Sequence, residues 1–476
     1  MKPTNLIIVM ADEHSRKVAG CYGHPLVQTP NIDRLAARGT RFASAYTPSP
    51  ICVPARAAFA TGRHVHQDGY WDNAHPFDGT RPSWQRVLRD RGHHVVSIGK
   101  LHFKGEGDHG FSEEIVPMHV VDGVGDVLGL IRNRVFERGA AYKMARLAGP
   151  GESSYSTYDR EIASQAQIWL REKGSKPHDK PWVLFVSFVT PHFPLTAPPD
   201  FYYRYPLDRL SPPKLYGQSE RPYHPFINDY ANSLTYDRHF DEPAVRRALA
   251  GYYGLCTFVD DLFGKVIAAV DAAALSDKTR IVYVSDHGDN LGARGLWGKS
   301  TMYEESVGIP LIVAGPEIPS GSVVERPVSL IDVVPFILES VGVPRDALAE
   351  LPGQGLFEDC THPILSEYHA TGSRTGAFML RSENTKYVYY PDYPDQLFDL
   401  AVDPEELRDL AGDLAYADRK RRMRDALWRL CDPDDVDRRA RRAQQARIEE
   451  LGGEEAILRR GDFGFSPPPG SKAAFS

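Results

Sequence analysis

Four apolar stretches of the sequence are each followed by side chains that can bind ions or carry protons. The stretches and the side chains after them are residues 6–10 with Asp12, Glu13 and His14, residues 94–98 with Lys100 and His102, residues 182–189 with His192, and residues 281–284 with Asp286, His287 and Asp289. One such group alone indicates little, because Asp and His are common in turns. Parallel strands, however, present their carboxyl ends at one edge of an open α/β sheet, and ligands bind there. We therefore expect these side chains to form one cluster that binds a cation and an anion.

Asp12, Asp286 and His287 are the candidates for metal ligands. Two carboxylates suit Ca²⁺ or Mg²⁺, and an imidazole nitrogen shifts the preference toward Mn²⁺ or Zn²⁺. A helix cap at Asp12 and a turn at Asp286 would account for the same residues without a metal. Other candidates are basic groups that could hold an oxyanion and move protons, although each alone could be an ordinary surface residue. They are Lys100, His102, His192 and Lys299.

The segments that must position these residues alternate between strand-like and helix-like patterns. A helix is expected from Pro30, after the capping residue Thr29, to the glycine stop at Gly39. A longer helix is expected over residues 245–273. Further helices are expected near residues 84–92, 162–174 and 331–338, and a further strand at residues 311–313. This alternation predicts an α/β fold with a mainly parallel sheet flanked by helices.

The pattern changes after Gly353. We expect a catalytic domain over residues 1–355 and a smaller C-terminal α+β subdomain over residues 356–476, with a small antiparallel sheet, helices and an extended tail. Within that subdomain, residues 377–380 and 387–390 are expected to pair as a hairpin.

Two segments have no clear periodicity. Residues 195–234 are rich in proline and tyrosine and are long for a loop, so they could form a lid or a pocket wall, or pack on the surface. Residues 466–470, with three successive prolines, are expected to form an extended arm. We expect these two segments to influence the substrate and the oligomeric state, and we expect a homo-oligomer.

The composition is that of a globular protein of 476 residues, with 42% hydrophobic and 25% charged residues. The net charge of −7 argues against a protein that coats nucleic acid, so no nucleic-acid partner is expected. The apolar run at residues 6–10 is far too short to span a membrane, and no targeting segment is visible, so we expect a cytoplasmic protein with no membrane partner. Five scattered cysteines form neither a disulfide framework nor a zinc pattern.

The segment Cys52-Val53-Pro54-Ala55-Arg56 resembles the active-site signature of the type I sulfatase family. In that family, a formylglycine-generating enzyme reads a Cys-x-Pro-x-Arg core and oxidises its cysteine to formylglycine. The core is intact here, and alanine stands where the family usually has serine before the arginine. The resemblance therefore implies formylglycine at Cys52 and the modifying enzyme as a partner. Further matching elements are residues 29–36, 99–102, 286–289, 298–299, 397–400 and 403–405.

The resemblance implies a fold similar to that of alkaline phosphatase and a role for each residue of the cluster. Cys52, as a formylglycine hydrate, would be the nucleophile and a ligand of one divalent metal, Ca²⁺ or Mn²⁺. The other ligands of that metal would be Asp12, Asp286 and His287. Arg56 would stabilise the hydrate.

The same resemblance assigns the remaining basic residues to the substrate. Lys100 and Lys299 would bind the sulfate oxygens. His102 would act as the base on the hydrate. His192 would contact the substrate and help to protonate the leaving oxygen.

Two motifs depart from the common sulfatase pattern. Asp12-Glu13 replaces a pair of aspartates, which makes Glu13 a doubtful metal ligand. Asp286-His287 replaces Asp-Asn. These features, together with an Asp-Asn element that ends at Asn73, resemble the branch of choline sulfatases and phosphonate monoester hydrolases. We expect Asn73 near the sulfate, unless it only caps a loop.

The sequence thus predicts hydrolysis of sulfate monoesters, of the aryl or small alkyl type, by a formylglycine hydrate with a divalent metal. A hydrolase of phosphonate monoesters or phosphodiesters that uses the same site, or a promiscuous enzyme that does both, is the alternative. A binding or scaffold protein with a degenerate site is a third interpretation, against which the intact signature and the basic residues argue.

Overall fold

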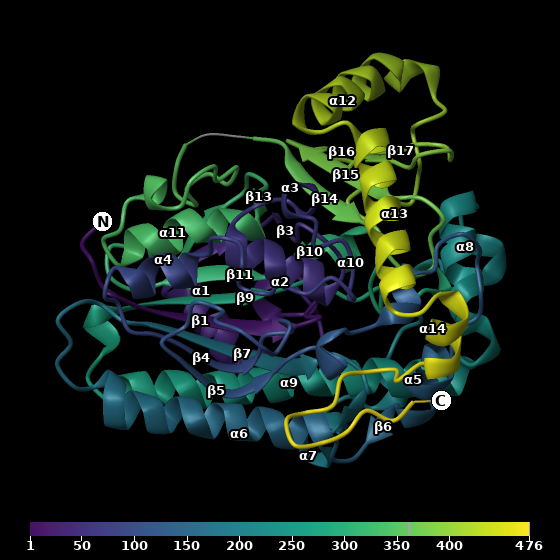
Figure 1. The fold of residues 1–476 in the computed structure, drawn as a ribbon. Coiled ribbons are helices and arrows are strands. Elements are labelled where there is room, and N and C mark those ends of the chain that lie inside the picture. Colours follow the sequence, from purple (N-terminus) through teal and green to yellow (C-terminus); the bar gives the residue numbers. More distant parts are fainter. Residues whose placement is uncertain (360–361, 476) are drawn as a thin grey trace.

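An eight-stranded sheet forms the centre of the computed structural model, which describes residues 1–359 and 362–475 (Figure 1). From edge to edge the strands are β12 (Ser322–Val324), β2 (Gly39–Phe42), β11 (Leu311–Ala314), β9 (Thr279–Ser285), β1 (Asn5–Asp12), β7 (Val183–Pro191), β4 (Val95–Lys100) and β5 (Glu113–Met118). The neighbouring strands from β9 to β5 are parallel, and β11 pairs antiparallel with both β9 and β2. The prediction of a mainly parallel α/β sheet is confirmed.

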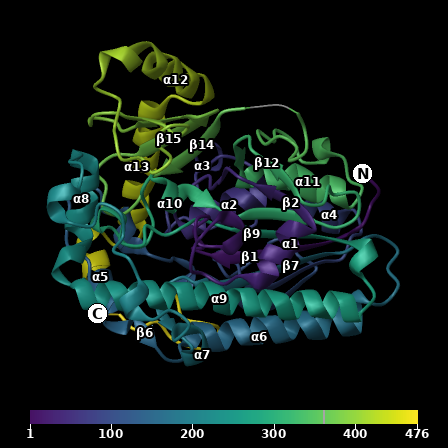
Figure 2. The same ribbon diagram turned by 180° about the vertical axis from the view of Figure 1, so that it is seen from behind.

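Helices cover both faces of this sheet (Figures 1 and 2). On one face lie α6 (Ser154–Trp169) and α9 (Glu242–Ala272), and on the other lie α2 (Cys52–Thr61), α4 (Trp84–Asp90) and α11 (Val333–Ser340). In β1, Ile7 packs with the first layer of helices and Ile8 with the second. An apolar run with this alternation is what a strand buried on both faces requires.

The predicted helices are present, with small differences at their ends. Helix α1 (Pro30–Ala37) begins at its proline, and β2 follows it at Gly39. Helix α9 begins earlier than predicted, because the Asp241 side chain caps it by accepting a hydrogen bond from the backbone N–H of Ala244 at 2.8 Å. Helix α6 continues to Gly174 as a wider, π-helical turn.

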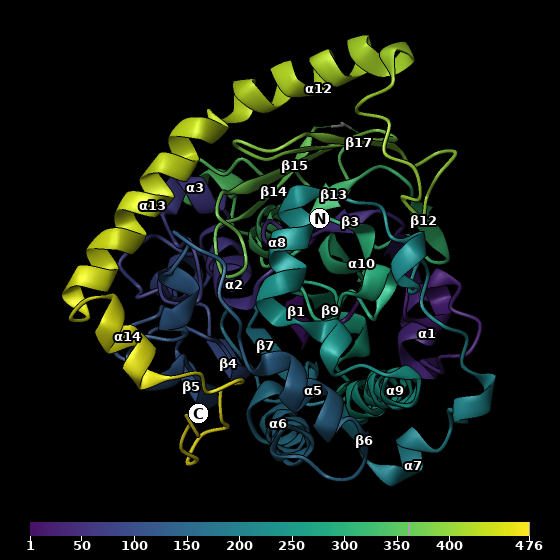
Figure 3. The same cartoon turned by 90° about the vertical axis from the view of Figure 1, so that its right-hand side faces the viewer.

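A second, antiparallel sheet lies in the C-terminal part of the chain. Its strands, in order, are β14 (Ile364–Tyr368), β15 (Ala377–Ser382), β16 (Thr385–Tyr389) and β17 (Gln396–Asp399). The predicted hairpin is formed by β15 and β16, in which Ser382 pairs with Thr385 across the turn. Helices α12 (Ala417–Leu430), α13 (Pro433–Glu450) and α14 (Glu454–Arg460) follow one another along the outside of the molecule (Figure 3).

Shorter elements connect these layers. They are β3 (Ala45–Tyr46), β10 (Gly308–Ile309) and β13 (Val328–Ser329) in a three-stranded sheet, β6 (Gly149–Pro150) paired with β8 (Thr196–Ala197), and helices α3 (Val65–Asp68), α5 (Ala140–Leu147), α7 (Pro199–Tyr202), α8 (Pro225–Leu234) and α10 (Glu304–Val307). The proline-rich and tyrosine-rich segment 195–234 therefore contains β8, α7 and α8.

The tail after α14 has no helix or strand in its described part, but its beginning is packed against α6. The hydroxyl of Tyr155 donates a hydrogen bond to the carbonyl oxygen of Ser466 at 2.7 Å. The rings of Phe465 and Tyr155 lie 5.3 Å apart. The aromatic side chain supplies the apolar area that holds this extended segment in place.

Two further observations concern helices and cysteines. Within residues 1–359 and 362–475, no helix is both long enough and apolar enough to cross a membrane. Cys21, Cys52, Cys256 and Cys431 are free thiols, and Cys360 lies outside the described residues.

Candidate active site

The polar residues predicted at the strand ends meet at the carboxyl edge of the sheet. Asp12 is the last residue of β1, Lys100 is the last residue of β4, and Asp286 and His192 directly follow β9 and β7. Helix α2 begins at this edge with Cys52. The expected cluster is therefore formed, from five segments of the chain.

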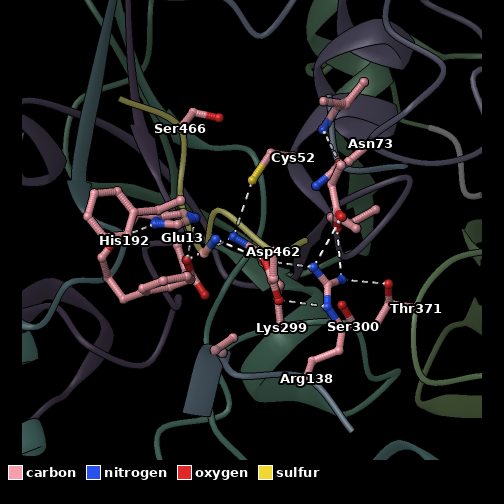
Figure 4. A pocket seen from close by; sticks show the side chains of 18 of the residues that line it. Glu13, Cys52, Asn73, Arg138, His192, Lys299, Ser300, Thr371, Asp462 and Ser466 are labelled. Carbon is pink, nitrogen blue, oxygen red and sulfur yellow. Dashed lines mark hydrogen bonds and ion pairs between the residues drawn. The ribbon is translucent and has the colours of Figure 1, made fainter. Parts of the chain in front are cut away.

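Cys52 lines a cavity of about 140 Å³ (Figure 4). Its Sγ lies 3.1 Å from Nε2 of His287, 3.2 Å from Nζ of Lys299 and 3.7 Å from Oδ1 of Asp12. Burial, followed by the charge of Asp12, raises the pKa of the Cys52 thiol to about 12. The residue is thus a buried thiol among ionised groups.

Asp12, Cys52, Asp286 and His287 fit a site for a divalent metal. One ligand atom from each lies within 4.8 Å of all the others, and all four residues are buried. Nδ1 of His287 lies 3.0 Å from the carbonyl oxygen of Gly288, so Nδ1–H can donate there and leave the Nε2 lone pair facing the cluster. Burial lowers the pKa of His287, which favours the neutral imidazole that a metal requires.

Arg56, one turn after Cys52 on α2, is clamped to the same carboxylates. Its Nε donates to Oδ2 of Asp286 at 2.8 Å, and its second terminal nitrogen donates to Oδ2 of Asp12 at 2.9 Å. The other terminal nitrogen donates to Oγ of Ser187 and to the carbonyl oxygen of Lys100. Among the described residues, the hydrogen bonds of Arg56 go to these groups and not to the sulfur of Cys52. The guanidinium therefore fixes both candidate metal-binding carboxylates.

The two lysines occupy different positions. Lys299 lines the cavity, and its Nζ lies 2.9 Å from Oε2 of Glu13 as well as 3.2 Å from the sulfur of Cys52. Lys100 is fully buried, and its Nζ lies 2.6 Å from Oδ2 of Asp12. Lys299 can therefore touch a molecule in the cavity, whereas Lys100 is not among the residues that line it.

His102 and His192 both line the cavity. Nδ1 of His192 lies 2.7 Å from the carbonyl oxygen of Phe193, and its Nε2 lies 3.4 Å from Oε2 of Glu13. His102 has a positive φ of 56°, and neither of its buried ring nitrogens has a hydrogen-bond partner in the described part of the chain. Burial and the neighbouring lysines lower the pKa of both histidines, so both rings are neutral and can accept protons.

Glu13, doubtful as a metal ligand from the sequence, forms a second group of possible ligands with Asp12 and His192, in which one atom from each lies within 4.8 Å of the others. Its carboxylate contacts Lys299 and His192 and lines the cavity, while its backbone N–H donates to Oδ1 of Asp286 at 3.1 Å. Burial raises the pKa of Glu13 to about 8. This carboxyl can therefore hold a proton near neutral pH, a property that its sequence position did not indicate.

Asn73 both caps a helix and lines the cavity. Its Oδ1 accepts a hydrogen bond from the backbone N–H of Val53, in the first turn of α2, at 3.2 Å. The same side chain forms part of the cavity wall. Asn73 therefore caps a helix and not only a loop, and its contact with the sulfate stays a prediction.

The far wall of the cavity was not identified from the sequence. Arg138 binds Asp126 through two hydrogen bonds of 2.9 and 3.1 Å, Asp462 at 3.1 Å and Oγ1 of Thr371 at 2.8 Å (Figure 4). Aromatic side chains complete the wall; they are Tyr155, Phe193, Tyr230, Tyr236, Tyr368, Phe463 and Phe465. These residues come from segments that share no local motif, and among them only Tyr230 lies in the tyrosine-rich segment 195–234.

Comparisons with known proteins agree with this geometry. The family model described as "Sulfatase" matches residues 4–343, and the model described as "N-sulphoglucosamine sulphohydrolase, C-terminal" matches residues 292–432. A choline-sulfatase of Rhizobium meliloti is 31% identical over 446 residues, which cover 89% of this chain and 86% of that protein. Arylsulfatase K of Danio rerio is 30% identical over 437 residues, which cover 86% of this chain and 80% of that protein.

A solved structure shows the same fold. The phosphonate monoester hydrolase of Agrobacterium radiobacter superposes with a TM-score of 0.75 at 22% identity, covering 90% of this chain and 95% of that chain. The family model, the relatives and the fold agree with the convergence of Cys52, Asp12, Asp286 and His287 at one sheet edge. The chain therefore belongs to the sulfatase family, a group of sulfuric ester hydrolases within the alkaline phosphatase superfamily.

Proposed function

We propose that this sulfatase hydrolyses sulfate monoesters of small aryl or alkyl alcohols, with formylglycine made from Cys52 as the reactive residue. The position of Cys52 is the main observation that supports this proposal. Its side chain lines the cavity, within 3.7 Å of two candidate metal ligands and of the Lys299 ammonium. A formylglycine-generating enzyme would act before α2 is packed, because Cys52 is only 1% exposed in the folded chain.

Asp12, Asp286 and His287, with the oxidised side chain of Cys52, would hold one divalent metal. Carboxylate oxygens predominate among these ligands, which favours Ca²⁺ or Mn²⁺. When bound, such a metal would make a hydroxyl of the hydrated formylglycine a better nucleophile and neutralise charge on the sulfate. Arg56 would keep the two carboxylates in the orientation that the metal requires.

The remaining residues would bind the sulfate and move protons. Lys299 would contact sulfate oxygens directly, and Lys100 would contribute its positive charge from its position beside Asp12. His192, whose Nδ1 is held by a backbone carbonyl, would become protonated on Nε2 once the negative sulfate offsets the charge of the neighbouring lysines. It would then give this proton to the leaving oxygen. His102 would accept a proton from the hydrate, since its ring nitrogens have no other partner among the described residues.

The charge of the site favours substrates with a single negative charge. Each buried cation has a carboxylate partner: Arg56 has Asp12 and Asp286, Lys100 has Asp12, and Lys299 has Glu13. With Glu13 ionised, these side chains together carry no net charge. A divalent metal, with one of its two charges offset by a deprotonated hydroxyl of the hydrate, would then leave a single positive charge for the substrate. Sulfate monoesters, phosphonate monoesters and phosphodiesters each carry one negative charge. The same site could therefore also hydrolyse phosphonate monoesters or phosphodiesters, the alternative activity.

A panel of esters with the same 4-nitrophenyl leaving group tests this function. We expect the highest kcat/KM for the sulfate monoester, lower values for the phosphonate monoester and the phosphodiester, and the lowest value for the dianionic phosphate monoester. The initial rates of nitrophenol release measure this order, and Cys52→Ala protein provides the blank. A phosphate monoester hydrolysed faster than every monoanion would contradict the proposal.

The tail is expected to limit the size of the alcohol. Residues 462–466 line the cavity, so a chain that ends at Gly461 would open one side of it. We expect KM for a small aryl sulfate to rise about tenfold, which corresponds to about 1.4 kcal/mol of lost contact, while bulkier sulfate esters gain relative to it. Steady-state kinetics on small and bulky esters measure the change.

The matched control for the tail is a chain that ends at Pro469. It lacks residues 470–476, and none of the described ones, 470–475, is among the residues that line the cavity. This protein is expected to retain the size preference of the full chain. If both truncated chains behave alike, the tail does not set the size of the substrate.

A further inference from the structure

A second cluster of metal-binding side chains lies outside the cavity, at the edge strand β5. Glu114 lies on β5, His109 precedes the strand and His119 follows its last residue. One ligand atom from each lies within 4.8 Å of the other two. Glu114 lies between the two rings: its Oε1 is 3.0 Å from Nδ1 of His109, and its Oε2 is 3.6 Å from Nε2 of His119. The ring centroids of the histidines are 5.2 Å apart.

The three residues are held ready for a cation. Partial burial raises the pKa of Glu114, but hydrogen bonds from His109 and His119 outweigh it and lower the pKa to about 2, so the group is a carboxylate. Nε2 of His109 and Nδ1 of His119 are buried and have no hydrogen-bond partner among residues 1–359 and 362–475. Each ring can therefore carry its proton on this outer nitrogen and present the lone pair of the nitrogen that faces Glu114.

We propose that His109, Glu114 and His119 bind a transition-metal ion such as Zn²⁺, Ni²⁺ or Co²⁺, at a site separate from the active-site metal. Ligand atoms about 2.0 Å from a tetrahedral ion are about 3.3 Å apart. The two rings lie at similar spacings from the carboxylate, His109 at 3.0 Å from Oε1 and His119 at 3.6 Å from Oε2. Two imidazoles and one carboxylate form a set of three ligands that leaves a fourth position for water. This nitrogen-rich set differs from the oxygen-rich set beside Cys52 and disfavours Ca²⁺ and Mg²⁺.

An ion can reach the site from one side. The side chains of Glu114 and His119 are 22% and 18% exposed, whereas that of His109 is 2% exposed. The buried ring of His109 packs against Phe103, with ring centroids 5.4 Å apart. The site thus has a fixed inner ligand and two outer ligands that solvent can reach.

The proposed ion would also fix the loop that carries His102. The backbone N–H of His102 donates to the carbonyl oxygen of Met118 at 2.9 Å, and that of Val120 donates to the carbonyl oxygen of Phe103 at 3.0 Å. His119 is thus flanked by two residues bonded to the active-site loop, and Val120 itself lines the cavity. A metal bound here would stabilise the position of a cavity histidine without touching the substrate.

Co²⁺ alone is the probe for this site. Equilibrium dialysis with metal analysis counts the bound ions, and the visible d–d absorption reports imidazole ligands. All proteins carry Cys52→Ala, so no thiol binds cobalt at the active site. We expect the further changes His119→Ala and Glu114→Gln each to lose one equivalent of Co²⁺ and its absorption. The control His178→Ala removes a histidine outside the cluster and is expected to lose neither.

The comparison is independent of the proposed hydrolysis. Asp12, Asp286 and His287 are unchanged in every protein, so any ion bound there contributes equally to all titrations. Glu114→Gln keeps the size of the side chain and therefore tests the charge even if His119→Ala folds poorly, which circular dichroism would detect. Equal numbers of bound ions and equal spectra in the parent and in Glu114→Gln would overturn the proposal and leave a hydrogen-bonded His–Glu–His network.

Discussion

Replacing Cys52 with alanine is expected to reduce the turnover of sulfate esters by on the order of 10⁴-fold or more, because it removes the nucleophile itself. The fold should survive, since the contacts of the side chain are confined to the site. We expect a loss of about 1 kcal/mol or less in the free energy of unfolding. Steady-state kinetics and denaturant unfolding measure the two quantities.

Cys256→Ala is the matched control for this change. Cys256 is also a free and fully buried thiol, but it lies in the apolar core around α9. Its replacement is expected to cost some stability and to leave turnover unchanged. The parent protein, expressed with a formylglycine-generating enzyme, should show an aldehyde in place of the thiol at residue 52 by peptide mass analysis. A fully active protein in which Cys52 is still an unmodified thiol would contradict the proposed mechanism.

Arg56→Lys is expected to have the largest effect on the metal site. Lysine keeps the charge but cannot reproduce the fork that binds Asp12 and Asp286 at once. We expect the free energy of unfolding to fall by about 2–3 kcal/mol and the affinity for Mn²⁺ or Ca²⁺ to fall by roughly 10- to 100-fold. Denaturant unfolding and calorimetric metal titration measure the two changes.

The Cys52→Ala background separates the two roles of Arg56. In that background no formylglycine exists, so a loss of metal affinity must come from the carboxylates. Arg160→Lys is the control, because Arg160 also binds a carboxylate through two bonds, to Glu152 at 2.6 and 2.8 Å, but at the surface. It is expected to change stability by about 0.5 kcal/mol or less and metal affinity not at all. An unchanged metal affinity in Arg56→Lys would confine Arg56 to a role on the modified residue.

Much of the fold and of the central cluster could be predicted from the sequence. Apolar runs such as residues 6–10 indicated buried strands, and their alternation with helices indicated a parallel sheet. That topology brings the carboxyl ends of the strands together, so Asp12, Lys100 and Asp286 could be placed at one edge before any distance was known. The resemblance of the segment around Cys52 to the sulfatase signature then supplied the family.

The partners of these residues could not be predicted in the same way. Arg56 follows Cys52 by one helical turn, yet it reaches Asp286, which is 230 positions away. Glu13 adjoins a metal-ligand candidate, yet its carboxylate is directed toward Lys299 and His192. Such contacts depend on how the α2 layer lies over the strand ends, which no local pattern encodes.

The sequence alone therefore determined the sheet, the edge at which the chemistry lies and the residues that could perform it, because strand periodicity and strand order act over short and regular distances. Tertiary structure alone decided the cavity wall, where Arg138 joins Asp126 to Asp462, and the cluster of His109, Glu114 and His119. Both depend on long-range packing: the first on a C-terminal tail folded back over α6, and the second on a loop turned against an edge strand.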